Sequence, residues 1–189
     1  MRMMNKIRKK LSTGRGFSLG ELLATTIILL LASQVMAEGV TFAVRMYNES
    51  LTRSHARQLC STLTASIETE LRYATSITYD ESTGVLQTYF SPNYGQSQSS
   101  FLTIDSDEQE TTSGEIAIKA TEQDQTVYRR LVSESSYSSF GLKAEIDAIQ
   151  YKENVFSVTL VILNKDNKKQ AENTFQVIPV NTLVINQNS

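Results

Sequence analysis

Cysteine and histidine are almost absent from this chain. It has one cysteine, Cys60, and one histidine, His55, in 189 residues. A single cysteine excludes an intrachain disulfide, and a metal site built from cysteine and histidine needs at least two converging ligands. The two residues are five positions apart, which does not place them on one face of a helix. We interpret both as packing or surface residues, and the sequence predicts no metal site and no cofactor.

The sequence patterns that mark common catalytic sites are missing as well. The chain has no Gly-Xaa-Ser-Xaa-Gly turn, no phosphate-binding loop and no paired zinc motif. A Ser-His-Asp site would have to use His55, which lies on a helical face that we expect to be covered. The prediction is that the protein is not an enzyme and has no catalytic residue.

Proline is also scarce, and neither of the two prolines interrupts residues 17–74. Within that range only Gly20 and Gly39 weaken a helix strongly. Apolar side chains return at helical spacing on one face, which predicts a helix over 17–75 whose later half lies against a domain. The predicted stripe consists of Tyr47, Leu51, His55, Leu59, Leu63, Ile67 and Leu71, with Val40, Val44 and Ala74 on the same face.

The composition is that of a folded protein with an uneven charge. Apolar residues make up 40% and charged residues 20% of the chain. The formal net charge is −2, but residues 1–16 carry six basic and no acidic residues. Without them, 12 basic residues face 20 acidic ones, a net charge of −8. Phosphate would repel such a protein at long range, so general binding to nucleic acid or anionic lipid is not expected.

A membrane-length apolar segment follows the basic stretch. Residues 22–37 carry no charge. Counted from Phe17, the segment has about 21 residues, close to the ~20 that a helix needs to cross a bilayer. The basic flank should stay in the cytoplasm and place the rest of the chain outside. Glu21 lies inside this segment, where an ionisable group is costly and usually has a partner and a function.

The run Gly16-Phe17-Ser18-Leu19-Gly20-Glu21, between a basic leader and an apolar helix, resembles the N-terminal signal of type IV prepilins and type II secretion pseudopilins. The resemblance implies that a prepilin peptidase cuts between Gly16 and Phe17 and then methylates the new amino group of Phe17. It also implies that Glu21 faces the N-terminal amine of a neighbouring subunit during assembly, because an ammonium group offsets the cost of a carboxylate in hydrocarbon.

This resemblance implies a structural role. The chain would be a minor pilin or pseudopilin of a type IV pilus, a DNA-uptake pilus or a type II secretion pseudopilus. Its partners would be the prepilin peptidase and methyltransferase, other pilin subunits contacted through the N-terminal helix, and an inner-membrane assembly platform. It would cross the cytoplasmic membrane once and then enter an extracytoplasmic filament. Contact with nucleic acid is possible but has no support in the sequence.

The chain departs from the family pattern at three points. Gly20 stands where the family usually carries an aliphatic residue, and Glu38-Gly39 stands where many members have a proline. Many well-known major pilins also close a C-terminal disulfide, which this chain cannot form. The missing disulfide and the length of the leader favour a minor over a major subunit.

An ordinary secretory signal is the alternative interpretation. Val35-Met36-Ala37 is an acceptable signal-peptidase site. The mature protein would then begin at Glu38 and be a secreted or anchored β-rich binding module. Two features favour the filament interpretation: Glu21 is badly placed for a plain signal, and the helical pattern continues past Ala37.

Beyond residue 75 the pattern changes to the alternation typical of strands. The fold class predicted is α+β, with a leader at 1–16, a long N-terminal helix at 17–75 and an extracytoplasmic, mainly antiparallel β-sheet domain at 76–189. The expected strands are Ser76–Tyr79, Val85–Tyr89, Phe101–Asp105, Glu115–Lys119, Thr126–Leu131, Ile146–Tyr151, Val155–Leu163 and Asn173–Pro179, with loops at 91–100, 106–114 and 133–141.

Two charged loops stand out in this predicted domain. An acidic loop holds Asp105, Asp107, Glu108 and Glu110. It lacks the glycine and terminal glutamate of a calcium-binding loop, so we interpret it as solvated. A basic loop holds Lys165, Lys168 and Lys169. We interpret it as a soluble turn that protects a sheet edge, with DNA contact as the less favoured alternative.

Overall fold

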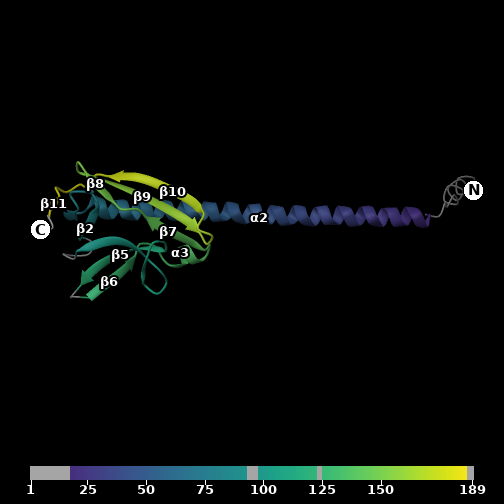
Figure 1. The fold of residues 1–189 in the computed structure, drawn as a ribbon, viewed down its shortest axis with the longest axis horizontal. Coiled ribbons are helices and arrows are strands. Elements are labelled where there is room, and N and C mark those ends of the chain that lie inside the picture. Colours follow the sequence, from purple (N-terminus) through teal and green to yellow (C-terminus); the bar gives the residue numbers. More distant parts are fainter. Residues whose placement is uncertain (1–17, 93–97, 123–124, 187–189) are drawn as a thin grey trace, which may run out of the picture. The chain divides into compact units, whose positions relative to one another are not determined.

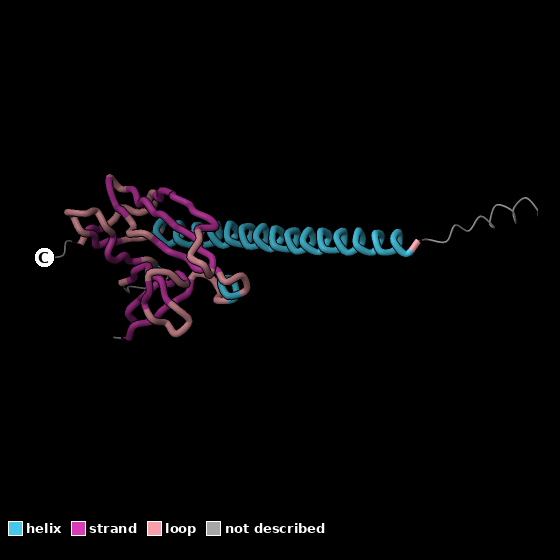
Figure 2. The backbone as a smooth tube through the Cα atoms, turned by 45° about the vertical axis from the view of Figure 1, so that its right-hand side comes forward, coloured by secondary structure: helices cyan, strands magenta, loops and turns pink. Residues whose placement is uncertain are grey.

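The computed structural model describes residues 18–92, 98–122 and 125–186. It contains one long helix, α2 (Leu19–Arg72, 54 residues), followed by a strand-rich region (Figure 1). The chain divides into two compact units, 1–48 and 49–189, with the boundary inside α2. We call the second unit the head. Its strands pack against one face of the C-terminal part of α2 (Figure 2).

Both ends of α2 have identifiable partners. At the N-terminus, the amide of Leu22 donates the first helical hydrogen bond to the carbonyl of Ser18. At the C-terminus, carbonyls of the last turn have no partner within a helix and need one elsewhere. The amide of Val180 donates to the carbonyl of Arg72 at 2.8 Å, and the side-chain amide of Asn181 donates to that of Tyr73 at 3.1 Å. The C-terminal segment of the chain therefore supplies hydrogen-bond donors for the last carbonyls of the helix.

The head contains two sheets. The larger has seven strands in the order β11-β1-β2-β3-β5-β6, with β4 paired to β3. All its pairs are antiparallel except β1 with β11. Its strands are β1 (Ser76–Tyr79), β2 (Leu86–Phe90), β3 (Ser99–Ile104), β4 (Glu110–Thr111), β5 (Glu115–Glu122), β6 (Gln125–Arg130) and β11 (Val184–Ile185).

The smaller sheet has four antiparallel strands, one of which is long and pairs with the other three. Its order is β10-β9-β7, with β8 also paired to β9. A short helix, α3 (Ser135–Ser138), precedes it. The strands are β7 (Leu142–Ile146), β8 (Gln150–Lys152), β9 (Val155–Asn164) and β10 (Lys169–Val177).

Gly114 joins the two sheets. Its amide donates to the carbonyl of Ala144 at 2.9 Å, and the amide of Ala144 donates back at 2.7 Å. A Cβ atom at residue 114 would lie 2.2 Å from the carbonyl oxygen of Ile104. Only glycine allows the backbone of β3 at Ile104 to lie so close to residue 114.

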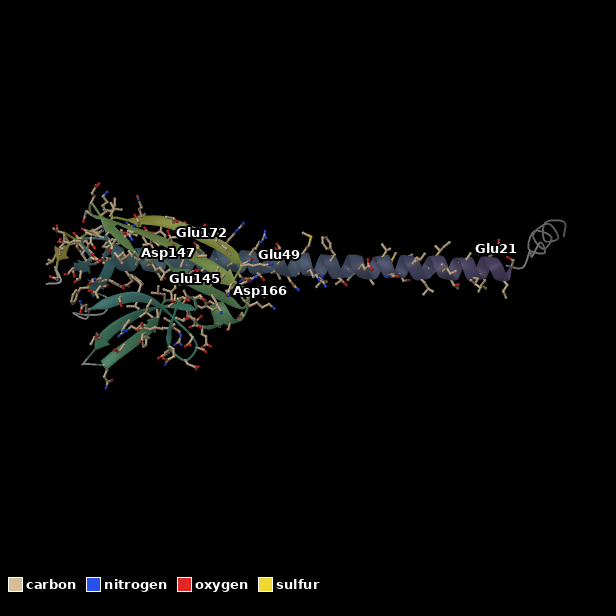
Figure 3. All side chains as sticks on the ribbon, viewed as in Figure 1. Glu21, Glu49, Glu145, Asp147, Asp166 and Glu172 are labelled. Carbon is tan, nitrogen blue, oxygen red and sulfur yellow. The ribbon has the colours of Figure 1, made fainter. Side chains whose placement is uncertain are left out.

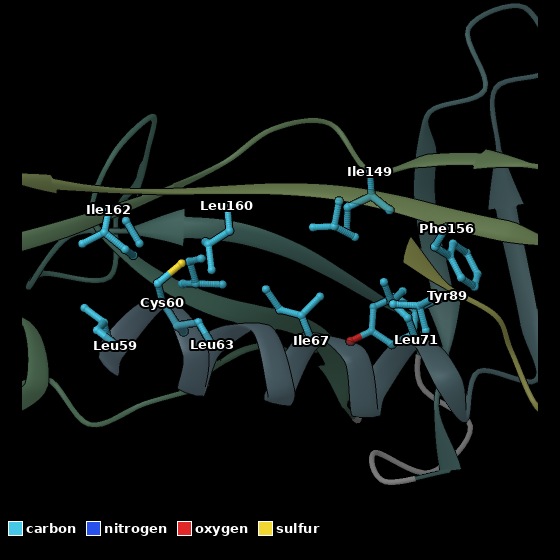
Figure 4. Packing of buried hydrophobic residues seen from close by; sticks show 14 of the residues in the cluster. Leu59, Cys60, Leu63, Ile67, Leu71, Tyr89, Ile149, Phe156, Leu160 and Ile162 are labelled. Carbon is cyan, nitrogen blue, oxygen red and sulfur yellow. The ribbon is translucent and has the colours of Figure 1, made fainter. Parts of the chain in front are cut away.

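Much of the core lies between α2 and the inner face of β9, and Ile77, Tyr89 and Ile116 of the larger sheet belong to the same buried cluster. Burial alternates along β9, as expected for a strand with one covered face (Figure 4). Each fully buried leucine or isoleucine stabilises the fold by about 1.5–3 kcal/mol relative to an exposed one. The helix contributes Ala56, Leu59, Cys60, Leu63, Ile67 and Leu71, and β9 contributes Phe156, Val158, Leu160 and Ile162.

The predicted apolar stripe is only partly covered. It is confirmed from Leu59 to Leu71, and Cys60 belongs to the same core. The prediction of a covered face is wrong at the other end, because Tyr47 is 64% exposed and Val40 and Val44 are exposed as well. The first buried helical side chain is Ala56. The exposed end of this face, with Val40, Val44 and Tyr47, belongs to the first unit, 1–48.

The predicted strand Ile146–Tyr151 is broken in the structure. β7 ends at Ile146 and β8 begins at Gln150, yet both pair with β9 on successive stretches. The amide of Asp147 still donates to the carbonyl of Thr159 at 3.1 Å, so the break is a local deviation from one strand edge. Most of β7 was not expected from the sequence.

Four further predictions need correction. β3 begins at Ser99, inside the predicted loop 91–100, of which residues 93–97 lie outside the described part. The loops 106–114 and 133–141 contain β4 and α3. β10 begins at Lys169, four residues before the predicted strand, because Asn164 closes a tight turn: its side-chain oxygen accepts from the amides of Asp166 and Lys168. β11 was not predicted at all.

Candidate functional site

The start of α2 holds the one predicted site residue that the structure describes. The side chain of Ser18 accepts a hydrogen bond from the amide of Glu21 at 3.2 Å. In return, the amide of Ser18 donates to Oε2 of Glu21 at 3.1 Å. This reciprocal arrangement is a capping box, which satisfies two of the four helical amides that lack a partner.

The capping box gives Glu21 a structural role that the sequence analysis did not assign. The Ser-Xaa-Xaa-Glu spacing at 18–21 is its sequence signature, so it could have been found there. A carboxylate near a helix N-terminus is also favoured by the helix dipole. Gly16 and Phe17, the predicted cleavage and methylation residues, lie outside the described residues.

The N-terminal part of α2, from Leu19 to Asn48, presents its apolar side chains to the surroundings. The helix is long and apolar enough to cross a membrane. Leu29, for example, is 61% exposed, and side chains stand on every side of the helix (Figure 3). The large exposed side chains are Leu19, Leu22, Leu23, Ile27, Ile28, Leu29, Leu30, Leu31, Val35, Met36, Val40, Phe42, Val44, Met46 and Tyr47.

Hydroxyl groups in this part of α2 bond to the helix itself. Thr25 donates to the carbonyl of Glu21 at 2.6 Å, and Ser33 donates to that of Leu29 at 2.7 Å. Thr26 and Thr41 make equivalent bonds at 2.8 and 2.9 Å. A hydroxyl that is already bonded is less costly to place in hydrocarbon than one without a partner. These residues are therefore compatible with a lipid environment.

Hydrogen bonds and ion pairs hold the acidic loop of the head in place at the protein surface. Oδ1 of Asp105 accepts from the amides of Asp107 and Gln109, both at 2.9 Å. Glu108 pairs with Arg130 at 2.9 Å, and Glu110 pairs with Lys119 at 2.8 Å. The hydrogen bond from Lys119, followed by one from Tyr128, lowers the pKa of Glu110. Among the described residues, no group of three or more potential ligands could hold a metal ion.

The head has two main cavities. A cleft of about 510 Å³ lies between the sheets, with Tyr89 and Phe101 on its wall and Glu145 and Asp147 beside them. A second cavity of about 330 Å³ is lined by serines near α3 and by His55. The His55 ring stacks on Phe140 with the ring centroids 3.7 Å apart, which is a packing contact. Neither lining includes a lysine, an arginine or a cysteine among the described residues.

No known protein family, curated protein or solved structure matches this chain. The architecture therefore defines its class: a long N-terminal apolar helix packed against mostly antiparallel sheets. This architecture is consistent with a pilin-like fold.

Proposed function

We propose that this chain is a structural filament subunit, a minor pilin or pseudopilin of a type IV pilus, a DNA-uptake pilus or a type II secretion pseudopilus. The observation that carries the proposal is the change along α2. Its large apolar side chains are exposed up to Tyr47, whereas those from Leu59 to Leu71 are buried in the head. The exposed part requires an apolar environment, which lipid provides before assembly and other copies of the helix provide afterwards.

Glu21 has a role in both states under this proposal. In the separate subunit its carboxylate accepts a hydrogen bond from the neutral amide of Ser18. In the filament it pairs with the methylated amine of Phe17 of a neighbouring subunit. A charge-assisted bond is roughly twice as strong as one between neutral groups, so the exchange favours assembly. The pair also fixes the axial register of one helix against the next.

The protein carries out no chemistry of its own in this role. It is the substrate of a prepilin peptidase and methyltransferase at Gly16 and Phe17. Its other partners are further pilin subunits and a membrane assembly platform. The subunit crosses the cytoplasmic membrane once, with the basic leader inside and the head outside.

A secreted β-rich module released after Ala37 is the competing function. The bond between Ala37 and Glu38 lies inside α2. The carbonyl of Ala37 accepts a hydrogen bond from Thr41 at 2.9 Å in addition to its place in the helical ladder. Cleavage there would require α2 to unwind locally, which supports the filament subunit over the secreted module.

The mass and N-terminal sequence of the mature protein from its native membrane test the proposal. We expect an N-methylated Phe17 at the start. Gly16→Val should leave the uncut precursor, whereas Gly14→Val, a matched change in the same leader, should be cut normally. A mature protein that begins at Glu38 would contradict the proposal and identify the secreted module.

A further inference from the structure

The basic residues of the head fall into two sets. The head contains eleven lysines and arginines. Arg129 has an interaction partner, and six others form ion pairs: Arg53, Arg72, Lys119, Arg130, Lys152 and Lys169. The remaining four, Arg57, Lys143, Lys165 and Lys168, form no ion pair with the part of the chain that the structure describes.

Three of these four lie at the turn between β9 and β10. Lys165 and Lys168 are exposed within the turn. Lys143 on β7 is opposite Leu163 of β9, and Lys169 of β10 is opposite the same residue on the other side. Lys143 and Lys169 thus flank Leu163 in one cross-strand row, about 10 Å apart, twice the strand spacing. Because β7 was not predicted, the sequence did not connect Lys143 with the turn.

The fourth residue, Arg57, lies at the same end of the head. It lines a cavity of about 210 Å³ with Ala171 and Glu172 of β10. Glu172 pairs with Lys169 at 2.6 Å, and Arg53, one helical turn before Arg57, pairs with Glu49 at 3.0 Å. Figure 3 shows Asp166 and Glu49 at this end.

We call this region the basic end. It consists of Arg53, Arg57, Lys143, Lys165, Lys168 and Lys169. Four acidic residues accompany them: Glu49, Glu145, Asp166 and Glu172. The basic end therefore carries a net charge of +2, whereas the rest of the head has five basic and fourteen acidic residues, a net charge of −9.

The basic end is also the end at which the chain enters the head. The head begins at Glu49. Residues 38–48, eleven in all, separate it from Ala37, the last residue of the uncharged run. Even a fully extended chain of that length spans only about 40 Å. Whatever the orientation of the two units, this length keeps the start of the head within about 40 Å of the end of the uncharged run, and so near the membrane that takes up the N-terminal part of α2.

We propose that the basic end binds the anionic phospholipid headgroups on the outer surface of that membrane. This inference rests on the membrane anchoring in the proposed function and adds a second, electrostatic contact. Lipid phosphates attract the four cations that have no ion pair, and they repel the rest of the head because of its charge of −9. The two effects together orient the unassembled head with its basic end toward the bilayer.

The short connection at residues 38–48, between the membrane-length run and the head, favours lipid over other anionic partners. Nucleic acid offers the same phosphate chemistry, and the acidic part of another head offers carboxylates. Both, however, must arrive by diffusion, whereas the membrane stays within reach of the basic end at a high effective concentration. Lipid contact would hold the separate subunit at the surface and would be broken when the subunit leaves the bilayer for the filament.

Amine acetylation of the full chain in lipid nanodiscs, with one copy per disc, tests this inference. Each lysine is followed by mass spectrometry in discs of phosphatidylcholine alone and in discs that also contain phosphatidylglycerol. We expect Lys143, Lys165 and Lys168 to react about fivefold more slowly in the anionic discs, which is the factor for about 1 kcal/mol per lysine. Lys152, which is 86% exposed on β8, is the internal control and should react equally in both discs.

Salt and charge reversal sharpen the test. The protection should disappear at about 1 M salt, where the Debye length is about 3 Å. Lys165→Glu with Lys168→Glu should abolish the protection of Lys143, whereas Lys152→Glu should leave it intact. Unchanged circular dichroism of the variants shows that the head is still folded.

Three results would overturn the inference. Equal reaction rates in both kinds of disc would exclude lipid binding. Protection only after addition of a DNA duplex would identify a nucleic-acid surface, and protection only in discs with two copies would identify a contact between heads. If the chain did not enter the discs at all, the membrane-anchored subunit itself would be wrong. Entry without lipid-dependent protection would remove only this further inference.

Discussion

The two parts of α2, Leu19–Asn48 and Glu49–Arg72, have the same backbone conformation but opposite surroundings. The first part leaves its large apolar side chains exposed, and the second buries one face in the head. Backbone hydrogen bonds alone therefore do not distinguish a helix that needs a lipid or protein environment from one that already has its partner. The distinction depends on which side chains another element of the same chain covers.

The polar residues of the two parts differ in the same way. In the first part, hydroxyl groups of Thr25 and Ser33 bond back to the helix, and residues 22–37 carry no charge. The second part carries Glu49–Arg53 and Glu68–Arg72 ion pairs on its exposed side. Such pairs, one helical turn apart, need water or a polar surface nearby. The same helix is thus adapted to two solvents.

The largest expected effect concerns Glu21 in the first part. Glu21→Val should leave cleavage after Gly16 largely intact but reduce incorporation into filaments by about 100-fold or more, because loss of one partner of a buried ion pair costs about 3–5 kcal/mol. Incorporation is measured from the amount of the variant in sheared filaments relative to the membrane. The free energy of unfolding of the head should not change.

Glu21→Gln separates the two roles of this residue. The side-chain oxygen of glutamine can still accept the hydrogen bond from the amide of Ser18, since a capping box can use either residue, but glutamine carries no charge. We expect Glu21→Gln to assemble as poorly as Glu21→Val. Normal assembly of the glutamine variant would assign the effect to the cap and refute the carboxylate-amine pair.

The next effect concerns the buried face of the second part. Leu63→Ala should reduce the free energy of unfolding of the head by about 2–5 kcal/mol, because it leaves a cavity at a position with no exposure. Urea unfolding followed by near-ultraviolet circular dichroism of the tyrosines measures the change. Leu29→Ala is the matched control in the first part and should alter head stability by less than about 0.5 kcal/mol. Equal effects would refute the separation of the two parts.

A third prediction tests how α3 is held in the head. The hydroxyl of Tyr137 accepts a hydrogen bond from the amide of Ile116 at 3.2 Å. Burial raises the pKa of Tyr137 to about 12, although this bond partly opposes the shift and the charge of Glu115 adds to it. The folded-state pKa therefore lies above the unfolded value, so the stability due to Tyr137 is complete below about pH 10. It should be lost between about pH 10 and 12, by roughly 2–3 kcal/mol.

Denaturation as a function of pH, with Tyr137→Phe for comparison, measures this loss. The variant should be less stable at neutral pH by about 1–3 kcal/mol, because the amide of Ile116 loses its acceptor. Its stability should then fall less steeply above pH 10. Parallel curves for the two proteins would show that ionisation of Tyr137 does not limit stability.

The smallest effect concerns the acidic loop. Glu110→Gln should lower the free energy of unfolding by less than about 1 kcal/mol, because its pair with Lys119 is exposed. The lowered pKa of Glu110 means that its contribution is present above the unfolded carboxyl pKa and is lost as the pH falls through the folded one. Lys119→Met should have a similar effect, and added salt should remove both. An effect that persists at high salt would show that the pair is not electrostatic.

Local sequence patterns were sufficient to predict the parts of the fold that depend on a single helix or a single strand. The absence of proline and the spacing of Leu59, Leu63 and Ile67 predicted the helix and its buried face. The alternation in Val155–Leu163 predicted β9 almost to its ends. Both signals are strong because each reflects a regular geometry that repeats many times. The capping box at Ser18 and Glu21 rests on an equally local signal, the Ser-Xaa-Xaa-Glu spacing.

Long-range contacts account for most of the errors. Val184 pairs with Ser76, from opposite ends of the head sequence, and only the folded chain brings β11 to β1. β7 and β8 were merged because residues 146–151 read as one alternating run. They separate because the register against β9 shifts by one residue between the pair Ile146–Leu160 and the pair Gln150–Ser157. A two-residue strand such as β11 has no periodicity from which it could be predicted.

The sequence by itself determined that this protein has a long helix with a membrane-length apolar run, a carboxylate at residue 21 and a strand-rich region after it. These properties follow from the order of apolar, charged and helix-breaking residues along one element. Only the tertiary structure decided that Tyr47 stays exposed while Cys60 is buried, and that Lys143 joins the turn at Lys165 and Lys168. Periodicity shows which face of an element is apolar, but another element must reach that face to cover it.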